Sequence, residues 1–360
     1  MKLTRLSACL AAACLCSSAA FAQSSVQLTG LVDMYAGSMQ LAGADRVSQV
    51  GSGGLSTSWW GMNGTEDLGN GLKAGFQLGA FFRGDTGAPG RYDLAFGESF
   101  FARDANVSLS GSFGALKLGR SSAPNFLPSV FANPFGDSFT VSPLILHANM
   151  WTAYTDTALK TYNTTASDTG WSNQIVYSSP SFGGLSFNLQ YQFGEVATAN
   201  SKKNVGANAT YRNGGLMLTG FYERAQVKNP TGALLYTDGG AKANWMLGGS
   251  YDFGVVKLYG TYGQSETKAN KAYEGKTATL GLDVPVTKAG TFKAAIAQTK
   301  IEARNAATGV LAFDGKRTTT TLGYDHFLSK RTDLYAALMH DKLTGVDSGT
   351  SFAVGMRHRF

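Results

Sequence analysis

Cysteine is confined to the beginning of this chain, where all three copies lie within residues 1–22. This segment is typical of a secretory signal peptide, because two basic residues precede a short apolar run and Ala20-Phe21-Ala22 offers a small-x-small cleavage pattern. Its removal would leave residues 23–360 without disulfides or thiol chemistry. Lipidation at Cys9 is the alternative, but no apolar region precedes that cysteine.

Long apolar runs are also missing, and no segment after residue 22 approaches the roughly 20 residues that a membrane-spanning helix needs. Like charges form no blocks. The net charge of +7 falls by two with the signal segment, which holds Lys2 and Arg5 and no acidic residue. The sequence therefore gives no reason to expect a nucleic acid partner.

Four scattered histidines and the lack of a nucleotide loop or nucleophile elbow argue against an enzyme, a cofactor and a metal site.

Glycine is abundant, with 45 copies against 8 prolines. Glycine-rich tight turns recur along the chain, and a longer polar stretch separates each turn from the next. The turns lie at residues 67–71, 110–114, 180–184, 212–215, 252–254, 287–290 and 328–331. Together with the longer loops they would join sixteen antiparallel strands. An even strand number with short turns at one end and long loops at the other is typical of an outer-membrane β-barrel.

Strict alternation of apolar and polar residues supports this interpretation. Residues 185–194 place leucine and aromatic side chains on one face and polar side chains or glycine on the other, and residues 72–83 are nearly as regular. A ten-residue strand tilted by about 45° spans roughly 23 Å, which suits the apolar band of such a barrel. A soluble β-sandwich would rarely turn so many aromatic residues outward, because such patches promote aggregation.

The last ten residues form a further amphipathic segment, which ends on Phe360 without a tail. A barrel has no free edges, so its last strand must pair with its first. We expect residues 351–360 to close on residues 25–34, with Phe360 at the closure. In residues 100–110, Arg103 shares its parity with apolar residues, and the opposite polar face could pack outward against another subunit.

Several segments, taken in order from end to end, resemble the trimeric general porins of β-proteobacteria, the neisserial and Bordetella/Burkholderia type. They are Ser25-Val26-Gln27-Leu28-Thr29-Gly30-Leu31-Val32-Asp33, Trp60-Gly61, Gly64-Thr65-Glu66-Asp67-Leu68-Gly69, Leu109-Ser110-Gly111-Ser112-Phe113-Gly114, Leu118-Gly119-Arg120, Ser179-Pro180-Ser181-Phe182-Gly183-Gly184 and Gly355-Met356-Arg357-His358-Arg359-Phe360.

The resemblance implies an all-β, sixteen-stranded antiparallel transmembrane barrel in the outer membrane of a Gram-negative bacterium. It implies a homotrimer and a water-filled channel for passive diffusion of ions and small hydrophilic solutes. It also implies that the long third loop, residues 121–168, folds into the lumen. The expected partners are outer-membrane lipid, other copies of the chain, the barrel-assembly machinery through the C-terminal strand, and small hydrophilic solutes.

The sequence departs from the family pattern at several charged positions. Asn133-Pro134-Phe135 stands where the family commonly has Asp-Pro-Phe, so one negative charge is missing from the third loop. Trp59, Asn63 and Val176 occupy positions that are often basic. The basic lining that is typical of the family is therefore thinned.

The remaining arginines suggest a selectivity filter. We hypothesise that Arg83, Arg103 and Arg120 line one wall of the pore and that Asp137 on the third loop faces them, since fixed guanidinium groups raise the local anion concentration. The expected channel is weakly anion-preferring. In the alternative interpretation these arginines pair with wall carboxylates such as Asp104 and carry no selectivity.

Trp59 supports a second hypothesis, in which an aromatic surface in the lumen holds sugar-like or aromatic solutes. The competing interpretation places Trp59 in the interfacial belt, where tryptophan is enriched. A third possibility is an adhesive or structural barrel, and loss of adhesion with normal conductance in loop deletions would distinguish it from a pore.

Overall fold

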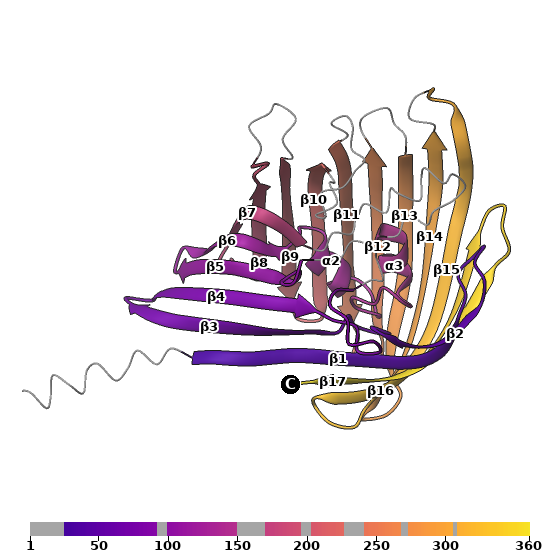
Figure 1. Ribbon diagram of the computed structural model, residues 1–360, viewed down its shortest axis with the longest axis horizontal. Helices are drawn as coiled ribbons and strands as arrows, with labels where there is room; N and C mark the ends of the chain where they lie inside the picture. Colours follow the sequence, from indigo (N-terminus) through magenta and orange to yellow (C-terminus); the bar gives the residue numbers. More distant parts are fainter. Residues whose placement is uncertain are drawn as a thin grey trace, which may run out of the picture.

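The computed structural model describes residues 25–91, 99–149, 170–195, 203–226, 241–267, 273–304 and 308–360, and the predicted signal segment lies outside these ranges. They form one antiparallel sheet that closes on itself (Figure 1). Its strands are β1 (Ser25–Met39), β2 (Val47–Ser52), β3 (Trp59–Gly69), β4 (Leu72–Phe81), β5 (Asp104–Gly111), β6 (Gly114–Ser122), β7 (Gly170–Ser178), β8 (Leu185–Gln192), β9 (Asn204–Asn213), β10 (Leu216–Gln226), β11 (Ala241–Asp252), β12 (Lys257–Thr267), β13 (Tyr273–Pro285), β14 (Gly290–Arg304), β15 (Leu311–Phe327), β16 (Thr332–Leu343) and β17 (Gly349–Arg359).

The seventeen strands fill sixteen positions in the barrel wall, because β2 and β3 share one position. Both pair with β1: Ser52 of β2 lies opposite Met34, and Trp59 of β3 lies opposite Leu31. Residues 53–58 interrupt the wall between them. The predicted sixteen-stranded barrel is thus confirmed, with one strand broken by a short loop.

The barrel closes between its first and last strands, as the sequence predicts. Residues 31–38 of β1 pair with residues 352–359 of β17. Beyond the end of β17, Phe360 exchanges two backbone hydrogen bonds with Gly30, at 3.0 and 3.1 Å. Gly30 is needed there, because a Cβ atom at this position would overlap the Phe360 ring.

Each of the seven predicted turns connects the two strands expected of it, from β3–β4 to β15–β16. The strands are strongly tilted, so β1, β3 and β4 run across the view of Figure 1 while β11 to β14 run nearly upright. Among the described residues, no helix is long and apolar enough to cross a membrane.

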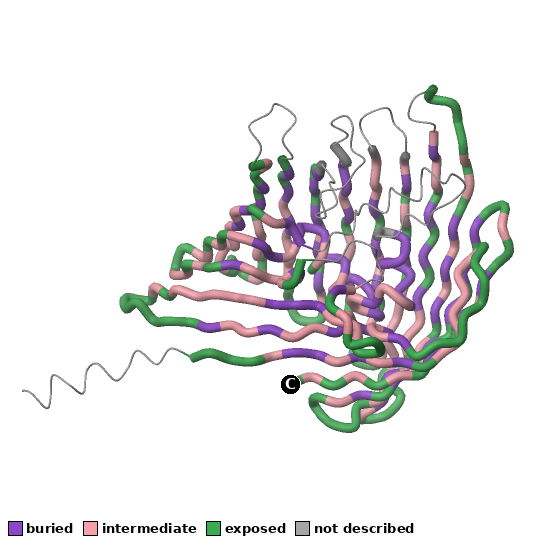
Figure 2. The backbone as a smooth tube through the Cα atoms, viewed as in Figure 1, coloured by how far each residue is buried: buried purple, intermediate pink, exposed green. Residues whose placement is uncertain are grey.

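The two faces of the wall differ in chemistry, and burial alternates along the strands (Figure 2). Outward-facing residues are large and apolar, such as Leu247 and Leu280, which are 65% and 67% exposed. Inward-facing residues such as Thr319 and Thr321 are polar and fully buried. The outer surface is therefore apolar, and the hydrogen-bonding groups line the interior.

The described part of the third loop lies inside the barrel, as the resemblance predicts. It carries two short helices, α2 (Phe126–Phe131) and α3 (Pro143–Asn149). Hydrogen bonds join it to β9 and β10 near its start and to β14 and β15 further along. The third loop therefore crosses the lumen of the barrel and is attached to the wall at several points (Figure 1).

The structure corrects the interpretation of residues 100–110. Val107 and Leu109 are exposed on the outer surface, whereas Asn106, on the opposite face, is buried in the interior. The polar face therefore lines the lumen and gives no outward polar surface for another subunit. Arg103 precedes the first residue of β5, so strand alternation does not decide its direction.

Candidate pore constriction

His147 attaches α3, the second helix of the third loop, to β14 and β15. The Nδ1 atom of His147 lies 2.7 Å from the hydroxyl of Thr299, and its Nε2 atom lies 2.7 Å from the hydroxyl of Thr319. Arg317 donates to the carbonyl of Leu146 at 3.4 Å. Burial, together with the nearby Arg317 charge, lowers the pKa of His147 to about 3, so the imidazole is neutral at physiological pH.

Arg317 is itself held by a carboxylate in the wall. Its Nε and Nη2 atoms each lie 2.9 Å from an oxygen of Asp341, and both side chains are at most 2% exposed. Thr319 and the backbone N–H of Ala42 donate to the same carboxylate. This bidentate pair is saturated with hydrogen bonds, so it serves the attachment of the loop and adds no net charge to the lumen.

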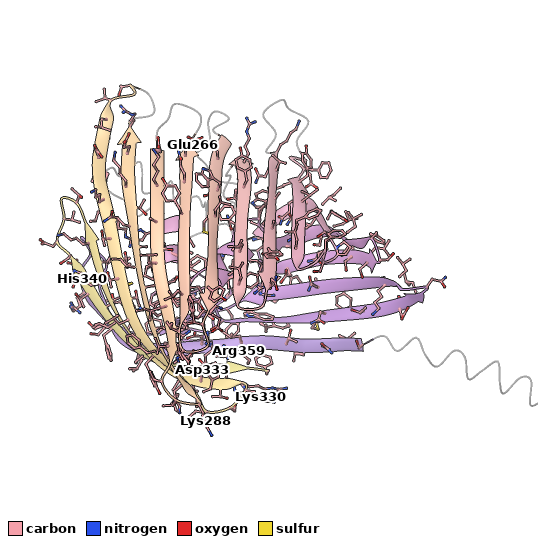
Figure 3. All side chains as sticks on the ribbon, turned by 180° about the vertical axis from the view of Figure 1, so that it is seen from behind. Glu266, Lys288, Lys330, Asp333, His340 and Arg359 are labelled. Atoms are coloured by element: carbon pink, nitrogen blue, oxygen red, sulfur yellow. The ribbon has the colours of Figure 1, made fainter. Side chains whose placement is uncertain are left out.

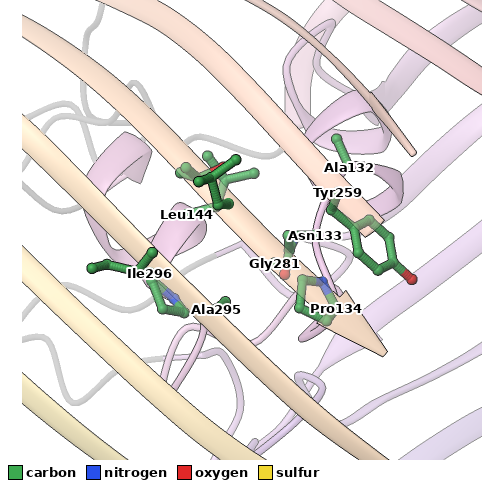
Figure 4. Close-up of a pocket in the computed structure, with 11 residues that line it drawn as sticks. Ala132, Asn133, Pro134, Leu144, Tyr259, Gly281, Ala295 and Ile296 are labelled. Carbon is green, nitrogen blue, oxygen red and sulfur yellow. The ribbon is translucent and has the colours of Figure 1, made fainter. Parts of the chain in front are cut away.

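The tip of the loop packs against β12 to β14 in a dry crevice that has no room for a water molecule (Figure 4). Pro134 lies so close to the wall that a Cβ atom at Gly281 would approach its Cδ atom to 2.7 Å. The amide of Asn133 donates to the carbonyls of Ser129 and Gly136, at 2.6 and 3.0 Å. An aspartate could not donate these bonds, which gives asparagine a structural role at this position.

The broken strand between β2 and β3 supports the tip from the opposite side. The Asp33 carboxylate accepts hydrogen bonds from the backbone N–H groups of residues 54, 55 and 56, at 2.7–3.0 Å, and from the Tyr335 hydroxyl. The ordered segment presents its carbonyls to the loop: Ser138 donates to Gly54 at 2.7 Å and Thr140 to Gly53 at 2.8 Å.

Asp137 lies within this contact region and not beside the three arginines that we expected it to face. Hydrogen bonds to the Ser56 side chain and the Thr57 backbone hold it, and the nearest cationic influence is Arg357. Burial raises the pKa of Asp137, and these hydrogen bonds only partly oppose the shift.

Arg357 was missed as a site residue, although it lies on the inward face of the C-terminal segment. Its Nη1 atom donates to Ser56 at 2.8 Å, and its guanidinium forms ion pairs with Asp333 and Asp325. Arg359 forms a second ion pair with Asp333, at 2.7 Å, and Figure 3 shows these two residues together. Both arginines of this wall are therefore paired with carboxylates.

The wall formed by β3 to β6 carries a different arrangement. Trp59 lies opposite Leu31 and Phe81, which are both inward-facing and buried, so Trp59 also faces inward. The next residue, Trp60, points outward and contacts the ring of Phe100. The guanidinium of Arg103 lies over the indole of Trp59, 3.7 Å from the ring centroid. The structure thus brings together two of the residues that the sequence singled out.

A second cation–aromatic pair lies beside the first. Arg91 lies 4.9 Å from the centroid of Phe81, which is the direct cross-strand neighbour of Trp59. Arg103 also forms an ion pair with Asp104, at 2.6 Å. Arg83 follows β4 with the parity of the inward-facing Phe81.

Arg120 lies at the base of the third loop and is buried. Its Nε atom donates to the carbonyl of Ala102, and its Nη1 atom donates to Ser172 at 2.9 Å. A register shift between Gly119 and Ser121 accommodates it in the wall. These two contacts join the loop base to the segment before β5 and to β7. Of the neutral positions, Val176 is buried and Asn63 lies on the inward face with Gln77.

Comparison with known proteins agrees with this geometry. A family model described as Gram-negative porin matches residues 8–345. Outer membrane porin protein 32 of Delftia acidovorans is 34% identical, with 96% of each chain covered, and an outer membrane porin protein of Bordetella pertussis is 30% identical over the full length of both chains. Among solved structures, an anion-selective porin from Comamonas acidovorans has a TM-score of 0.73 at 29% identity, covering 94% of this chain and all of the other.

Proposed function

We propose that this chain, which belongs to the Gram-negative porin family and forms a diffusion channel in the outer membrane, passes anions in preference to cations. The observation that carries the proposal is the distribution of charge around the third loop. Between residues 82 and 122, the described residues include five cations, Arg83, Arg91, Arg103, Lys117 and Arg120, against two carboxylates, Asp85 and Asp104. Residues 92–98, outside the described ranges, add Asp93 and Glu98, which leaves residues 82–122 with one net positive charge. Glu66, Asp67 and Lys73 lie near the turn between β3 and β4, at the other end of these strands.

Several carboxylates elsewhere in the wall add little free negative charge, because they form ion pairs. Asp341 pairs with Arg317, Asp333 pairs with Arg357 and Arg359, and Asp283 pairs with Lys293 at 3.3 Å. Fixed guanidinium groups on one side of a narrow aqueous path raise the local concentration of anions. The similar porin from Comamonas acidovorans is described as anion-selective, which is consistent with this proposal.

The test is the reversal potential of the purified protein in a planar bilayer under a KCl gradient. The wild type should give a potential of the anion-permeable sign, and the double substitution Arg83→Ala with Arg103→Ala should move it toward zero. The matched control is Lys288→Ala with Lys330→Ala, which also removes two positive charges but from the turns at one end of the barrel (Figure 3). Unchanged selectivity in the arginine variant would contradict the assignment.

We also propose that three copies assemble, as the resemblance to trimeric porins implies. A trimer form of OmpT from Vibrio cholerae shares the fold, with a TM-score of 0.62 at 15% identity, over 94% of this chain and 99% of that one. The apolar outer face would contact lipid, and the C-terminal strand would present Phe360 to the barrel-assembly machinery. Native mass spectrometry in detergent should give three times the chain mass, and a monomer alone would contradict the trimer.

A further inference from the structure

We propose that the stacked pair of Trp59 and Arg103 is a binding site in the lumen for planar, aromatic carboxylates. The inference deepens the proposed anion preference and rests on it. It begins from the position of Trp59, whose neighbours across both adjacent strands, Leu31 and Phe81, are inward-facing. A tryptophan of the interfacial belt would have the opposite parity, which the outward-facing Trp60 has.

The Arg103 side chain also lies on the lumen side. A Cβ atom built on Gly79, whose parity is that of the inward-facing Phe81, would lie 3.4 Å from the Cβ of Arg103. The side chain of Arg103 is 33% exposed, so a solute can reach it. Stacking on Trp59 orients the guanidinium plane, and the ion pair with Asp104 engages one Nη atom.

This arrangement favours a carboxylate over a sugar. The guanidinium already covers the indole face on which a sugar ring would stack. Its edge, by contrast, can bind a carboxylate through two parallel N–H bonds, because arginine carries five donors in a planar fork. A carboxylate bound in this way lies in the guanidinium plane. An aromatic ring joined to it then lies near the guanidinium plane, at the height of the stack.

Phe81 and Arg91 extend the surface in the direction of β4. Phe81 is the direct cross-strand neighbour of Trp59, and Arg91 lies over its ring. An aromatic anion above these side chains meets two guanidinium groups, which attract both its carboxylate and the face of its ring. A saturated ring of equal charge and similar size lacks the flat π-face and gains only the charge interaction.

The experiment compares how benzoate and cyclohexanecarboxylate block the KCl current of single channels in a planar bilayer. Benzoate should block at about tenfold lower concentration, because a desolvated cation–π contact contributes on the order of 1–2 kcal/mol. Trp59→Ala and Arg103→Lys should each abolish this difference. Arg103→Lys keeps the charge and loses the planar fork, so it separates stacking from simple attraction.

Two control variants complete the design. Trp60→Ala removes the outward-facing tryptophan next to Trp59 and should keep the preference for benzoate. Lys117→Ala removes an inward cation that donates to Gln77 and carries no aromatic partner among the described contacts, so it should weaken anion selectivity while keeping the benzoate ratio.

The outcomes separate this inference from the proposed function. An anion-selective channel that benzoate and cyclohexanecarboxylate block equally would overturn the binding site and leave the anion preference standing. A channel that is not anion-selective would overturn the proposed function and, with it, the charge basis of the site. A benzoate preference that survives in Trp59→Ala and Arg103→Lys would place the aromatic site elsewhere and contradict the inference.

Discussion

At Arg357, three parts of the molecule meet through one side chain. The guanidinium contacts Asp333 on β16, Asp325 on β15 and Ser56 in the break between β2 and β3. A buried ion pair of this kind costs desolvation, and removal of one partner leaves an uncompensated charge. Because its carboxylate partners neutralise it, we expect Arg357 to position the loop and the broken strand rather than to attract anions.

Asp33 gives a prediction at the scale of a single residue. Asp33→Ala would leave three backbone N–H groups of residues 54–56 without their acceptor, at a cost of about 1–3 kcal/mol per buried group. Because Ser138 and Thr140 hold the loop tip through this segment, the variant should unfold at lower temperature and show noisier single-channel current. Asp347→Ala removes an exposed carboxylate and should change neither quantity.

The third loop is the element whose position sets the pore. Its tip lies against the wall because Gly281 and Gly323 have no side chains; a Cβ atom at Gly323 would approach the ring of Phe135 to 2.8 Å. The loop path therefore depends on small residues in distant strands as much as on its own sequence. Such close contacts leave little tolerance for added volume.

Gly281→Ala tests this dependence. The added methyl group would meet Pro134 and push the tip off the wall into the lumen, so the conductance should fall and the stability should drop by about 1–3 kcal/mol. Gly260→Ala is the matched control on β12, since its Cβ atom would have no neighbour closer than 3.8 Å. Equal conductance in the two variants would contradict the close packing of the tip.

His147 gives a prediction for the pH dependence of the same element. The unfolded chain binds a proton at His147 below about pH 6.5, whereas the folded protein keeps the imidazole neutral down to about pH 3. Stability should therefore decrease as the pH falls, by about 3 kcal/mol between pH 7 and pH 4.

The measurement is the urea unfolding of the wild type and His147→Gln in detergent at both pH values. The wild type should lose more stability than the variant, because the glutamine does not titrate. Asp137, whose raised pKa acts with the opposite sign, is present in both proteins and cancels in the comparison. Equal losses in the two proteins would contradict a buried, neutral His147.

At the scale of the whole molecule, the barrel depends on closure between its two ends. Deletion of Phe360 would remove both hydrogen bonds to Gly30 and leave unpaired backbone groups at the seam. We expect a lower yield of folded barrel, measured by the heat-dependent shift in electrophoretic mobility. Phe352→Ala truncates an aromatic residue with the same outward orientation, at the far end of the strand, and should fold with normal yield.

Local residue patterns were enough to predict the strands, their turns and most of their faces. In a strand with alternating apolar and polar residues, the apolar side must face the lipid, so the outward face of residues 185–194 follows from the local pattern. The amphipathic C-terminal segment marks the last strand, which must pair with the first to close the barrel at Phe360. The alternating pattern left the direction of Trp59 open between the lumen and the interfacial belt, and its pairing with Leu31 and Phe81 decided it. The contacts of the charged residues could not be predicted in this way, because nothing in the sequence next to Asp137 or Arg120 indicates what they contact.

Those contact partners come from segments that are far apart in the sequence. The bond between Asp33 and Tyr335 joins residues 302 positions apart, and the bond between Arg317 and Leu146 spans 171 positions. The direction of the Arg103 side chain could not be derived from alternation, because Arg103 lies one residue before its strand. Strand faces are fixed by local periodicity, whereas the lining of the pore depends on where a long loop comes to rest against a closed wall.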